Sequence, residues 1–201
     1  MSLPGGILIA RIMVPGPADT DVEGKDATIK YHSTMDAMSR GTEDGLKIYL
    51  QIIAMLIVMT ALTALVNIIL SALPPVFGAP LTIERMLGWL FAPMVWLYGV
   101  PWHEAATAGS LAGIKVVLTE LIAYVRMAAL PPGSLDPRAT QIMVYAMCGF
   151  GNLASVGILI GGMSAIIPER REEIVSLAMK ALVSGTLASG LTGAMIGLLP
   201  L

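Results

Sequence analysis

The amino-acid sequence predicts an all-α integral membrane protein that combines transmembrane helices with one re-entrant hairpin and one broken helix. Hydrophobic residues make up 56% of the 201 residues and charged residues only 13%, whereas a soluble domain carries about 25% charge. An uncharged run over residues 139–168 exceeds the ~20 apolar residues that a helix needs to cross a bilayer. Glycines and polar residues interrupt this run near its middle, which predicts the break.

The first 47 residues divide into an apolar start and a polar connector. Residues 1–15 are apolar but too short for a full span, and we expect them to be the end of a truncated membrane helix. Residues 16–47 are rich in both signs of charge, which predicts a connector outside the membrane that becomes helical from about Thr28. His32 in this connector is expected to be a solvated side chain.

The clearest predicted transmembrane helix covers residues 48–73, which are uncharged and end at two prolines. We expect its polar side chains Thr60, Thr63 and Asn67 to bond neighbouring helices rather than a ligand. A tryptophan-rich segment follows, and because amphipathic rings settle at the headgroup level, it predicts an interfacial helix over residues 81–100.

Residues 102–130 predict the re-entrant hairpin, because they contain two short helical pieces that cannot span the membrane separately. Glu120 opens the second piece, and a carboxylate in an apolar membrane segment is costly and marks a functional site by default. Two other interpretations stay open. Glu120 could pair with Lys115 or Arg126, or the tip of the hairpin could simply reach water.

Residues 139–167 predict the broken helix. The stretch CGFGNLAS at residues 148–155 places two glycines beside an amide and a hydroxyl, so the helix is expected to open there. Discontinuous helices near the bilayer midplane build the substrate sites of many secondary transporters. The alternative is close helix packing through the glycines, with Asn152 bonded to a neighbouring helix.

The last predicted helix covers residues 172–199 and carries a packing face of small residues. Cations concentrate on the side that holds the 16–47 connector and the 169–180 loop. The positive-inside rule therefore places both in the cytoplasm and the C-terminus outside. We expect a multi-pass protein of the inner (plasma) membrane, with the lipid bilayer as its surroundings.

Composition also excludes several classes of function. The net charge of −2 gives no basic footprint, so we expect no nucleic-acid partner. The single cysteine, Cys148, rules out an internal disulfide and a cysteine-rich metal cluster, and we interpret it as a small packing residue. No Ser/His, Cys/His or metal-spaced constellation accompanies Glu120, so we expect no catalytic residues and no metal site.

Three stretches together resemble the C-terminal half of the concentrative nucleoside transporter family. They are GIK at 113–115 with LTELIAY at 118–124, CGFGNLAS at 148–155, and PERR at 168–171. Their order and spacing agree with the family, and the likeness covers nearly the whole chain. The sequence departs from the family at Thr119, where asparagine is usual, and at Gly151, where alanine is common.

The resemblance implies a function as well as a fold. It implies that Glu120, Asn152 and Ser155 hold the ribose of a nucleoside and that Phe150 lines the pocket. A carboxylate accepts hydrogen bonds from vicinal hydroxyls, while an amide and a hydroxyl both donate and accept, so the chemistry is suitable.

The same resemblance implies half of an inverted-repeat transporter fold that assembles as a homotrimer. The helix over 48–73 would belong to a scaffold and residues 81–201 to a mobile transport domain. The family's N-terminal half, which grips the nucleobase and helps form the site of the coupling Na⁺ or H⁺, has no counterpart in this sequence. We therefore expect a fragment, a truncated gene product or a mis-assigned start, with no cofactor of its own.

The leading hypothesis is cation-coupled nucleoside uptake by a secondary active transporter, with this chain supplying the ribose-binding half. The alternative is a non-transporting membrane interaction subunit or an inactive truncated fragment. A membrane enzyme that uses Glu120 as an acid or base is the weakest hypothesis, because the carboxylate has no catalytic companion.

Overall fold

A computed structural model describes residues 2–16, 32–76, 78 and 80–199, and its regular secondary structure over those residues is entirely helical. The all-α prediction is therefore confirmed, whereas residues 17–31 of the predicted connector lie outside the described part. The helices are α1 (Ser2–Met13), α2 (Thr34–Ser71), α3 (Ile83–Leu97), α4 (Trp102–Val117), α5 (Glu120–Ala128), α6 (Pro137–Met147), α7 (Leu153–Ile166), the short 3₁₀ helix η1 (Pro168–Arg170) and α8 (Arg171–Gly197).

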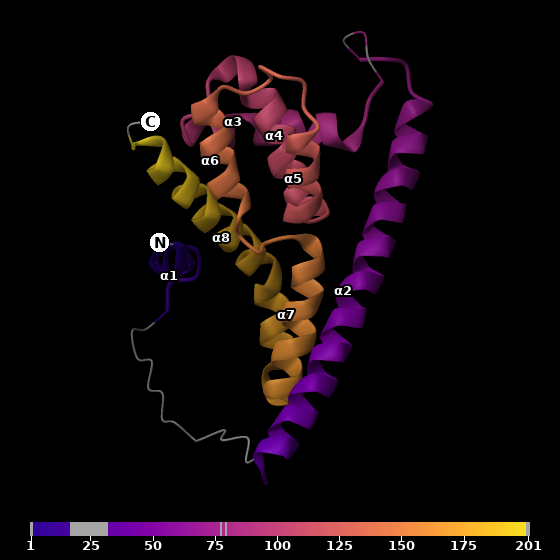
Figure 1. Cartoon of the computed structure of the whole chain (residues 1–201), viewed down its shortest axis with the longest axis vertical. Coiled ribbons are helices and arrows are strands. Elements are labelled where there is room, and N and C mark those ends of the chain that lie inside the picture. The colour runs from indigo at the N-terminus through magenta and orange to yellow at the C-terminus, as the bar shows by residue number, and fades with distance from the viewer. Residues whose placement is uncertain (1, 17–31, 77, 79, 200–201) are drawn as a thin grey trace.

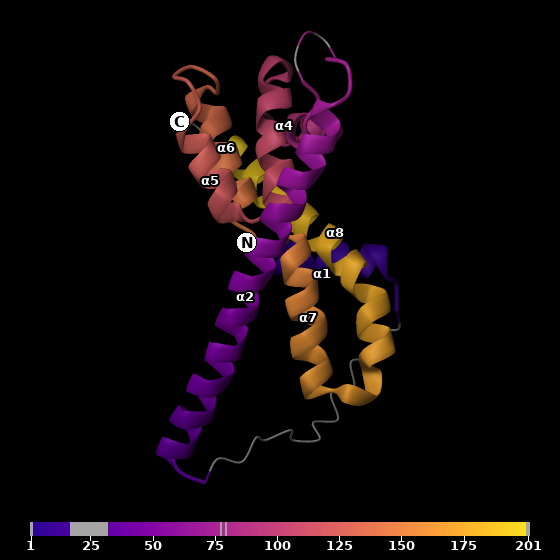
Figure 2. The ribbon, with the colours of Figure 1, turned by 90° about the vertical axis from the view of Figure 1, so that its right-hand side faces the viewer.

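The helices form two groups along one long helix. α2 runs the length of the molecule, with α3, α4, α5 and α6 gathered at one end and α7 with the first half of α8 at the other (Figure 1). α1 packs across α8, which the side view in Figure 2 shows. The arrangement leaves the point between the two groups, where α6 gives way to α7, near the centre of the molecule.

α2 is longer than the predicted helix over 48–73, because it begins at Thr34. Ser33 caps its first turn by accepting the backbone N–H of Asp36 at 3.1 Å. Arg40 then donates to the carboxylate of Asp36 at 2.9 Å, one turn further on. The second half of the predicted connector is thus part of the helix, because local charge pairs and a cap favour helix where hydropathy carries no signal.

The polar side chains of α2 behave in two ways. As predicted, Asn67 joins α2 to a neighbouring helix: its Nδ2 donates to both carboxylate oxygens of Glu84 at 3.1 and 3.2 Å, and its Oδ1 accepts the N–H of Ile83 at 2.8 Å. The interhelical prediction is wrong for Thr60 and Thr63. Their hydroxyls donate to carbonyls of α2 itself, at 2.7 and 2.8 Å, because the carbonyl four residues earlier is the nearest acceptor.

α3 and α4 approach each other closely because glycines lie at their contact. A Cβ added at Gly109 would lie 2.5 Å from the carbonyl oxygen of Gly88, and one at Gly113 would overlap the Cβ of Leu87. Only hydrogen fits at these distances, so backbones meet here as they do in small-residue contacts between membrane helices.

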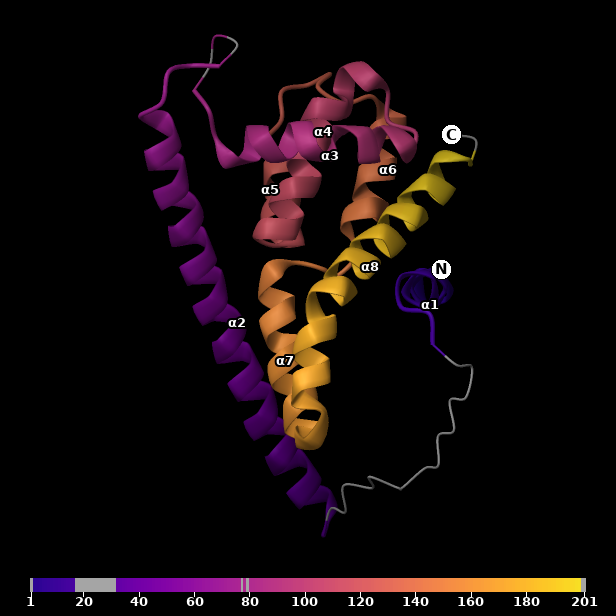
Figure 3. The ribbon, with the colours of Figure 1, turned by 180° about the vertical axis from the view of Figure 1, so that it is seen from behind.

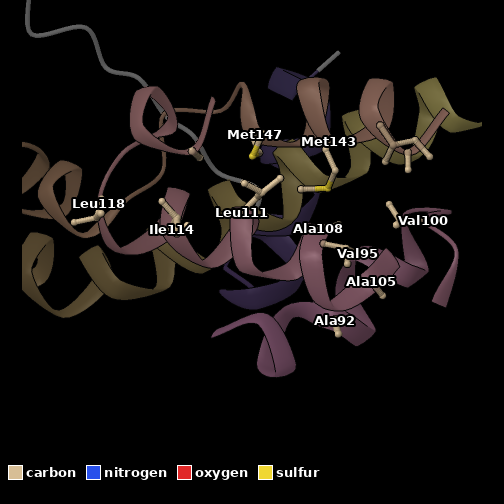
Figure 4. Close-up of a cluster of buried hydrophobic side chains, with 13 residues drawn as sticks. Ala92, Val95, Val100, Ala105, Ala108, Leu111, Ile114, Leu118, Met143 and Met147 are labelled. Atoms are coloured by element: carbon tan, nitrogen blue, oxygen red, sulfur yellow. The ribbon is translucent and has the colours of Figure 1, made fainter. Parts of the chain in front are cut away.

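The hydrophobic core lies where α3, α4 and α6 meet (Figure 4). Val95, Leu111, Met143 and Met147 are all at most 2% exposed. Each such side chain stabilises the fold by roughly 1.5–3 kcal/mol relative to an exposed one. The core holds α4 and α6 firmly, and therefore fixes the positions at which both helices end.

α8 packs through small residues against α6 and against Tyr98, the residue that follows α3. A Cβ added at Gly193 would lie 2.7 Å from the Cβ of Ala146 and 2.8 Å from the carbonyl oxygen of Ile142. At Gly190 it would overlap the Tyr98 hydroxyl. The packing face expected in the last helix is therefore the face that meets the core.

Within the part of the chain that the structure describes, two helical stretches are long and apolar enough to cross a membrane, namely Thr34–Ser71 and Pro168–Gly197. In the most apolar window of α2 only 6% of the residues are buried inside the protein, so this helix is no core helix of a soluble domain. Its exposed side chains include Ile57, Leu65 and Ile68. A continuous apolar face of this kind marks contact with lipid or with a partner.

Candidate functional site

Two interruptions in the helical chain meet at the centre of the molecule. The first is the two-residue connector Leu118–Thr119 between α4 and α5, and the second is the segment 148–152 between α6 and α7. Figure 3 shows the beginning of α5 facing the beginning of α7. The contact is direct, because the Nδ2 of Asn152 donates to the Oε2 of Glu120 at 3.3 Å.

The sequence opens both helices through local capping. Leu118 leaves helical geometry with φ −102° and ψ −98°, and Thr119 then caps α5 by accepting the N–H of Ile122 at 3.4 Å. Asn152 caps α7 with its Oδ1, which accepts the N–H of Ser155 at 2.8 Å. Each new helix thus starts where a side-chain oxygen replaces a missing backbone acceptor.

Asn152 and Ser155 cap each other. The Oγ of Ser155 accepts the backbone N–H of Asn152 at 3.0 Å and donates to the Asn152 carbonyl at 2.6 Å. This reciprocal capping box fixes both side chains on the first turn of α7. Asn152 is only 1% exposed, so its geometry is held by the protein rather than by solvent.

Hydrogen-bonding capacity is left over on all three polar residues. The Nδ2 of Asn152 carries a second hydrogen, the hydroxyl of Ser155 has one free lone pair, and the Glu120 carboxylate has several acceptor positions. Two helix N-termini point into the same region, and their partial positive charge favours the carboxylate there. The arrangement can bind neighbouring hydroxyl groups, which need both donors and acceptors.

A pocket of about 250 Å³ lies beside the break, on the α7–α8 side. Phe150, Gly151 and Ser155 line it, together with residues of α7 and α8. Phe150 is 63% exposed, so its ring is open to a ligand. Asn152 and Glu120 do not line this pocket. Asn152 lies beside it, because it follows Gly151 in the chain and bonds to Ser155, and Glu120 is bonded to Asn152.

The structure separates the interpretations that the sequence left open for Glu120. Over the described residues it pairs with neither Lys115 nor Arg126, and its hydrogen-bond partner is Asn152. Asn152 is bonded to a neighbouring helix, as the packing interpretation of the break expected, but the partner is the carboxylate of the candidate site. Cys148, expected to be a packing residue, is instead exposed at the end of α6, because the helix stops before it is covered.

Sequence reasoning named four site residues and missed the wall that α8 provides. Ala178, Ala181 and Leu182 of α8 line the pocket beside Phe150. The small-residue pattern of the last helix indicated a packing face, but not which helix it would meet. Among the described residues, no group of three His, Cys, Asp or Glu side chains is placed to hold a metal ion.

Comparison with known proteins decides the family. Residues 1–197 match the family model described as "Na+ dependent nucleoside transporter C-terminus". The chain belongs to the concentrative nucleoside transporter family. Its matching part is the C-terminal half of that family, as the three sequence stretches indicated.

Relatives from bacteria and mammals share this half. The chain is 36% identical to the uncharacterized transporter YutK of Bacillus subtilis and 35% identical to the nucleoside permease NupC of Helicobacter pylori, each over 98% of this chain. It is 31% identical to mouse solute carrier family 28 member 3 over 99% of this chain. It spans 50%, 49% and 31% of these relatives, so it covers half or less of the proteins it matches.

Solved structures agree with the sequence comparison. A variant of the transporter CNTnw in an intermediate state superposes with a TM-score of 0.87 at 38% identity, over 98% of this chain and 49% of that one. CNTnw in an inward-facing substrate-bound state gives a TM-score of 0.79 at 37% identity, over 96% and 47%. At these identities both fold and family are shared, and the chain is an integral membrane protein of a transporter family.

Proposed function

We propose that this chain supplies the ribose-binding half of a cation-coupled nucleoside carrier in the plasma membrane. The observation that supports this most strongly is the contact between Asn152 and Glu120, which joins the starts of α5 and α7 at 3.3 Å. It turns two interrupted helices into one polar site inside an apolar protein. NupC of Helicobacter pylori, a relative over almost the whole chain, is named as a nucleoside permease.

The chemistry of the site suits the vicinal hydroxyls of ribose. Glu120 accepts from the 2′- and 3′-hydroxyls, while Asn152 donates its remaining hydrogen to a sugar oxygen and Ser155 accepts through its free lone pair. A site built to bond hydroxyls rejects analogues that lack them, because its own polar groups would then lose partners.

The size of the pocket indicates that it takes only part of the nucleoside. Its volume of about 250 Å³ lies below the roughly 300–1,000 Å³ of complete small-molecule sites. Phe150 and the apolar wall of α8 cover one side of the ligand. The nucleobase and the coupling Na⁺ or H⁺ are held by the N-terminal half of the transporter, which is the part of the relatives that this chain does not match.

Assembly and orientation complete the proposal. α2 acts as the scaffold helix of a homotrimer. Residues 81–201, which include the re-entrant hairpin α4–α5 and the broken helix formed by α6 and α7, move as the transport domain. The polar segment before α2 and the η1 loop lie in the cytoplasm, and the C-terminus lies outside, in keeping with the positive-inside rule.

Uptake measurements test this function. We expect proteoliposomes of the intact transporter, which contains this chain as its C-terminal half, to accumulate radiolabelled uridine only under an inward Na⁺ or H⁺ gradient. Glu120→Gln should abolish most of the uptake while leaving the oligomer intact on gel filtration, because it removes the charge and keeps the size. Uridine uptake that is unchanged by Glu120→Gln would refute the role of this residue.

One observation favours a second candidate, a membrane interaction subunit. A groove of about 620 Å³ runs between α1 and α8, lined by apolar residues together with Arg11 and Lys180. An apolar groove of this size suits another transmembrane segment. Gel filtration in detergent after co-expression with a candidate membrane partner separates the two functions, because an interaction subunit forms a stoichiometric complex and binds no uridine.

A further inference from the structure

Lys115 is a buried cation that the ribose site described above does not use. It lies in the last turn of α4, and its side chain is only 2% exposed. Its Nζ has no hydrogen-bond partner among the described residues. An isolated buried ammonium is strongly unfavourable, so a buried lysine that keeps its proton needs an opposite charge nearby.

The surroundings of Lys115 are sparse in polar groups. A cavity of about 10 Å³ adjoins it, lined by methionines and alanines together with Tyr98 and Thr186. The Tyr98 hydroxyl is also buried and has no hydrogen-bond partner in the described part of the chain, and the hydroxyl of Thr186 already donates to the Leu182 carbonyl at 2.9 Å. Such a volume holds about one water molecule. The neutral groups and one water can solvate the ammonium, but they cannot balance its charge.

The position of Lys115 links it to the site. Its Nζ lies 3.4 Å from the point that a Cβ on Gly151 would occupy, so the ammonium rests against the backbone of the helix break. Asn152 follows Gly151 directly. The carboxylate whose charge acts on Lys115 is Glu120, which stands just beyond the connector that ends α4 and makes no ion pair with the ammonium.

We propose that Lys115 is a positioning residue of the ribose site: its buried ammonium is the through-space counter-charge of Glu120 and supports the break at Gly151. The inference rests on the proposed function. The acceptor positions of Glu120 stay free for sugar hydroxyls because its balancing charge lies behind the site instead of on it. A direct ion pair would occupy the acceptor positions that the ribose needs.

A purely structural role predicts something different. The ammonium also lies near the carbonyl-rich ends of α4 and α6, where a cation stabilises helix C-termini. If that were its whole purpose, its removal would weaken the fold and the binding of every ligand alike. A counter-charge for Glu120 acts on the sugar hydroxyls alone.

The test compares uridine with 2′,3′-dideoxyuridine, which lacks both sugar hydroxyls, in binding to the protein in lipid nanodiscs. Lys115→Met keeps the length of the side chain and removes its charge. We expect it to weaken uridine binding by at least about tenfold, the loss expected for a hydrogen bond to a charged group. Dideoxyuridine binding should change less than about twofold on the same scale. Thr186→Val, which removes a neutral group from the same cavity, is the matched control and should preserve the preference for uridine.

Combining substitutions makes each outcome decisive. Glu120→Gln with Lys115→Met should lose no more uridine affinity than Glu120→Gln alone, because the two residues act as one unit. Equal losses for both ligands in Lys115→Met would overturn the inference. If Lys115→Met does not fold, the folding of the double variant with Glu120→Gln becomes the test. Removing both charges should restore folding, and a double variant that still does not fold would contradict the pairing of the two charges. Retained uridine preference in Glu120→Gln alone would instead defeat the proposed function.

Discussion

Asn152 performs two tasks at the helix break, and substitutions can separate them. Its Oδ1 caps α7, while its Nδ2 donates to Glu120. Asn152→Ser keeps an oxygen for the cap but cannot reach across to the carboxylate. Asn152→Ala removes both interactions, so the difference between the two variants isolates the cap.

The magnitudes follow from the geometry. A hydrogen bond to a charged group stabilises by about 1.5–3 kcal/mol, and the long 3.3 Å separation from Glu120 places this one at the lower end, about 1.5 kcal/mol. Loss of an N-cap costs about 1 kcal/mol. Asn152→Ser is therefore expected to lose about 1.5 kcal/mol and Asn152→Ala about 2.5 kcal/mol of unfolding free energy.

Reversible SDS titration in mixed micelles, followed by circular dichroism, measures these differences. Gly162→Ala is a suitable control in the same helix, because nothing lies within 4 Å of the added Cβ and stability should stay level or rise slightly. An Asn152→Ser variant as stable as wild type would show that the bond to Glu120 contributes nothing. Equal losses for Asn152→Ser and Asn152→Ala would show that the cap contributes nothing to stability.

Two further predictions concern packing and the loop before α6. Gly193→Ala should destabilise the protein by about 1–3 kcal/mol in the same titration, because the new Cβ would lie 2.8 Å from the Ile142 carbonyl oxygen. Gly185→Ala on the same helix is the control, because its Cβ meets nothing within 4 Å and should leave stability unchanged or raise it. Similar losses for both variants would contradict the close approach of α6 and α8. Glu104→Ala should lower the unfolding free energy by about 1–3 kcal/mol, because the backbone N–H of Asp136 donates to the Glu104 carboxylate at 3.1 Å. Glu104→Gln keeps an acceptor and should lose less stability. Equal losses for the two variants would contradict a role for this hydrogen bond.

Both helix breaks could be predicted from the sequence, because the residues next to each break indicate it. Gly149 and Gly151 precede Asn152 and weaken the helix there, and the two pieces within residues 102–130 are each too short to span a membrane, so the pattern alone indicated both interruptions. It did not indicate that Thr119 and Asn152 would cap the new helices. The resemblance added roles for four residues. What it could not supply was the bond between Asn152 and Glu120, since these residues are 32 positions apart and meet only through packing of the core.

Other features escaped prediction for similar physical reasons. Helix was predicted from about Thr28 and a transmembrane helix from residue 48, but not that both belong to the single helix α2 from Thr34, because hydropathy registers apolar content and not the Ser33 cap and charge pairs that begin it. Thr60 and Thr63 turned to their own helix, since an internal acceptor is always in reach. The isolation of the Lys115 ammonium depends on three other helices and has no local sequence signal beyond a charge in an apolar run.

If the start of α5 and the start of α7 hold a ribose together, an electron cryo-microscopy structure of the protein in nanodiscs with uridine bound will show it. We expect the 2′- or 3′-hydroxyl oxygen within about 2.5–3.2 Å of both the Glu120 carboxylate and the Asn152 side chain, as hydrogen bonds require. Uridine bound with its sugar away from these two residues would contradict it.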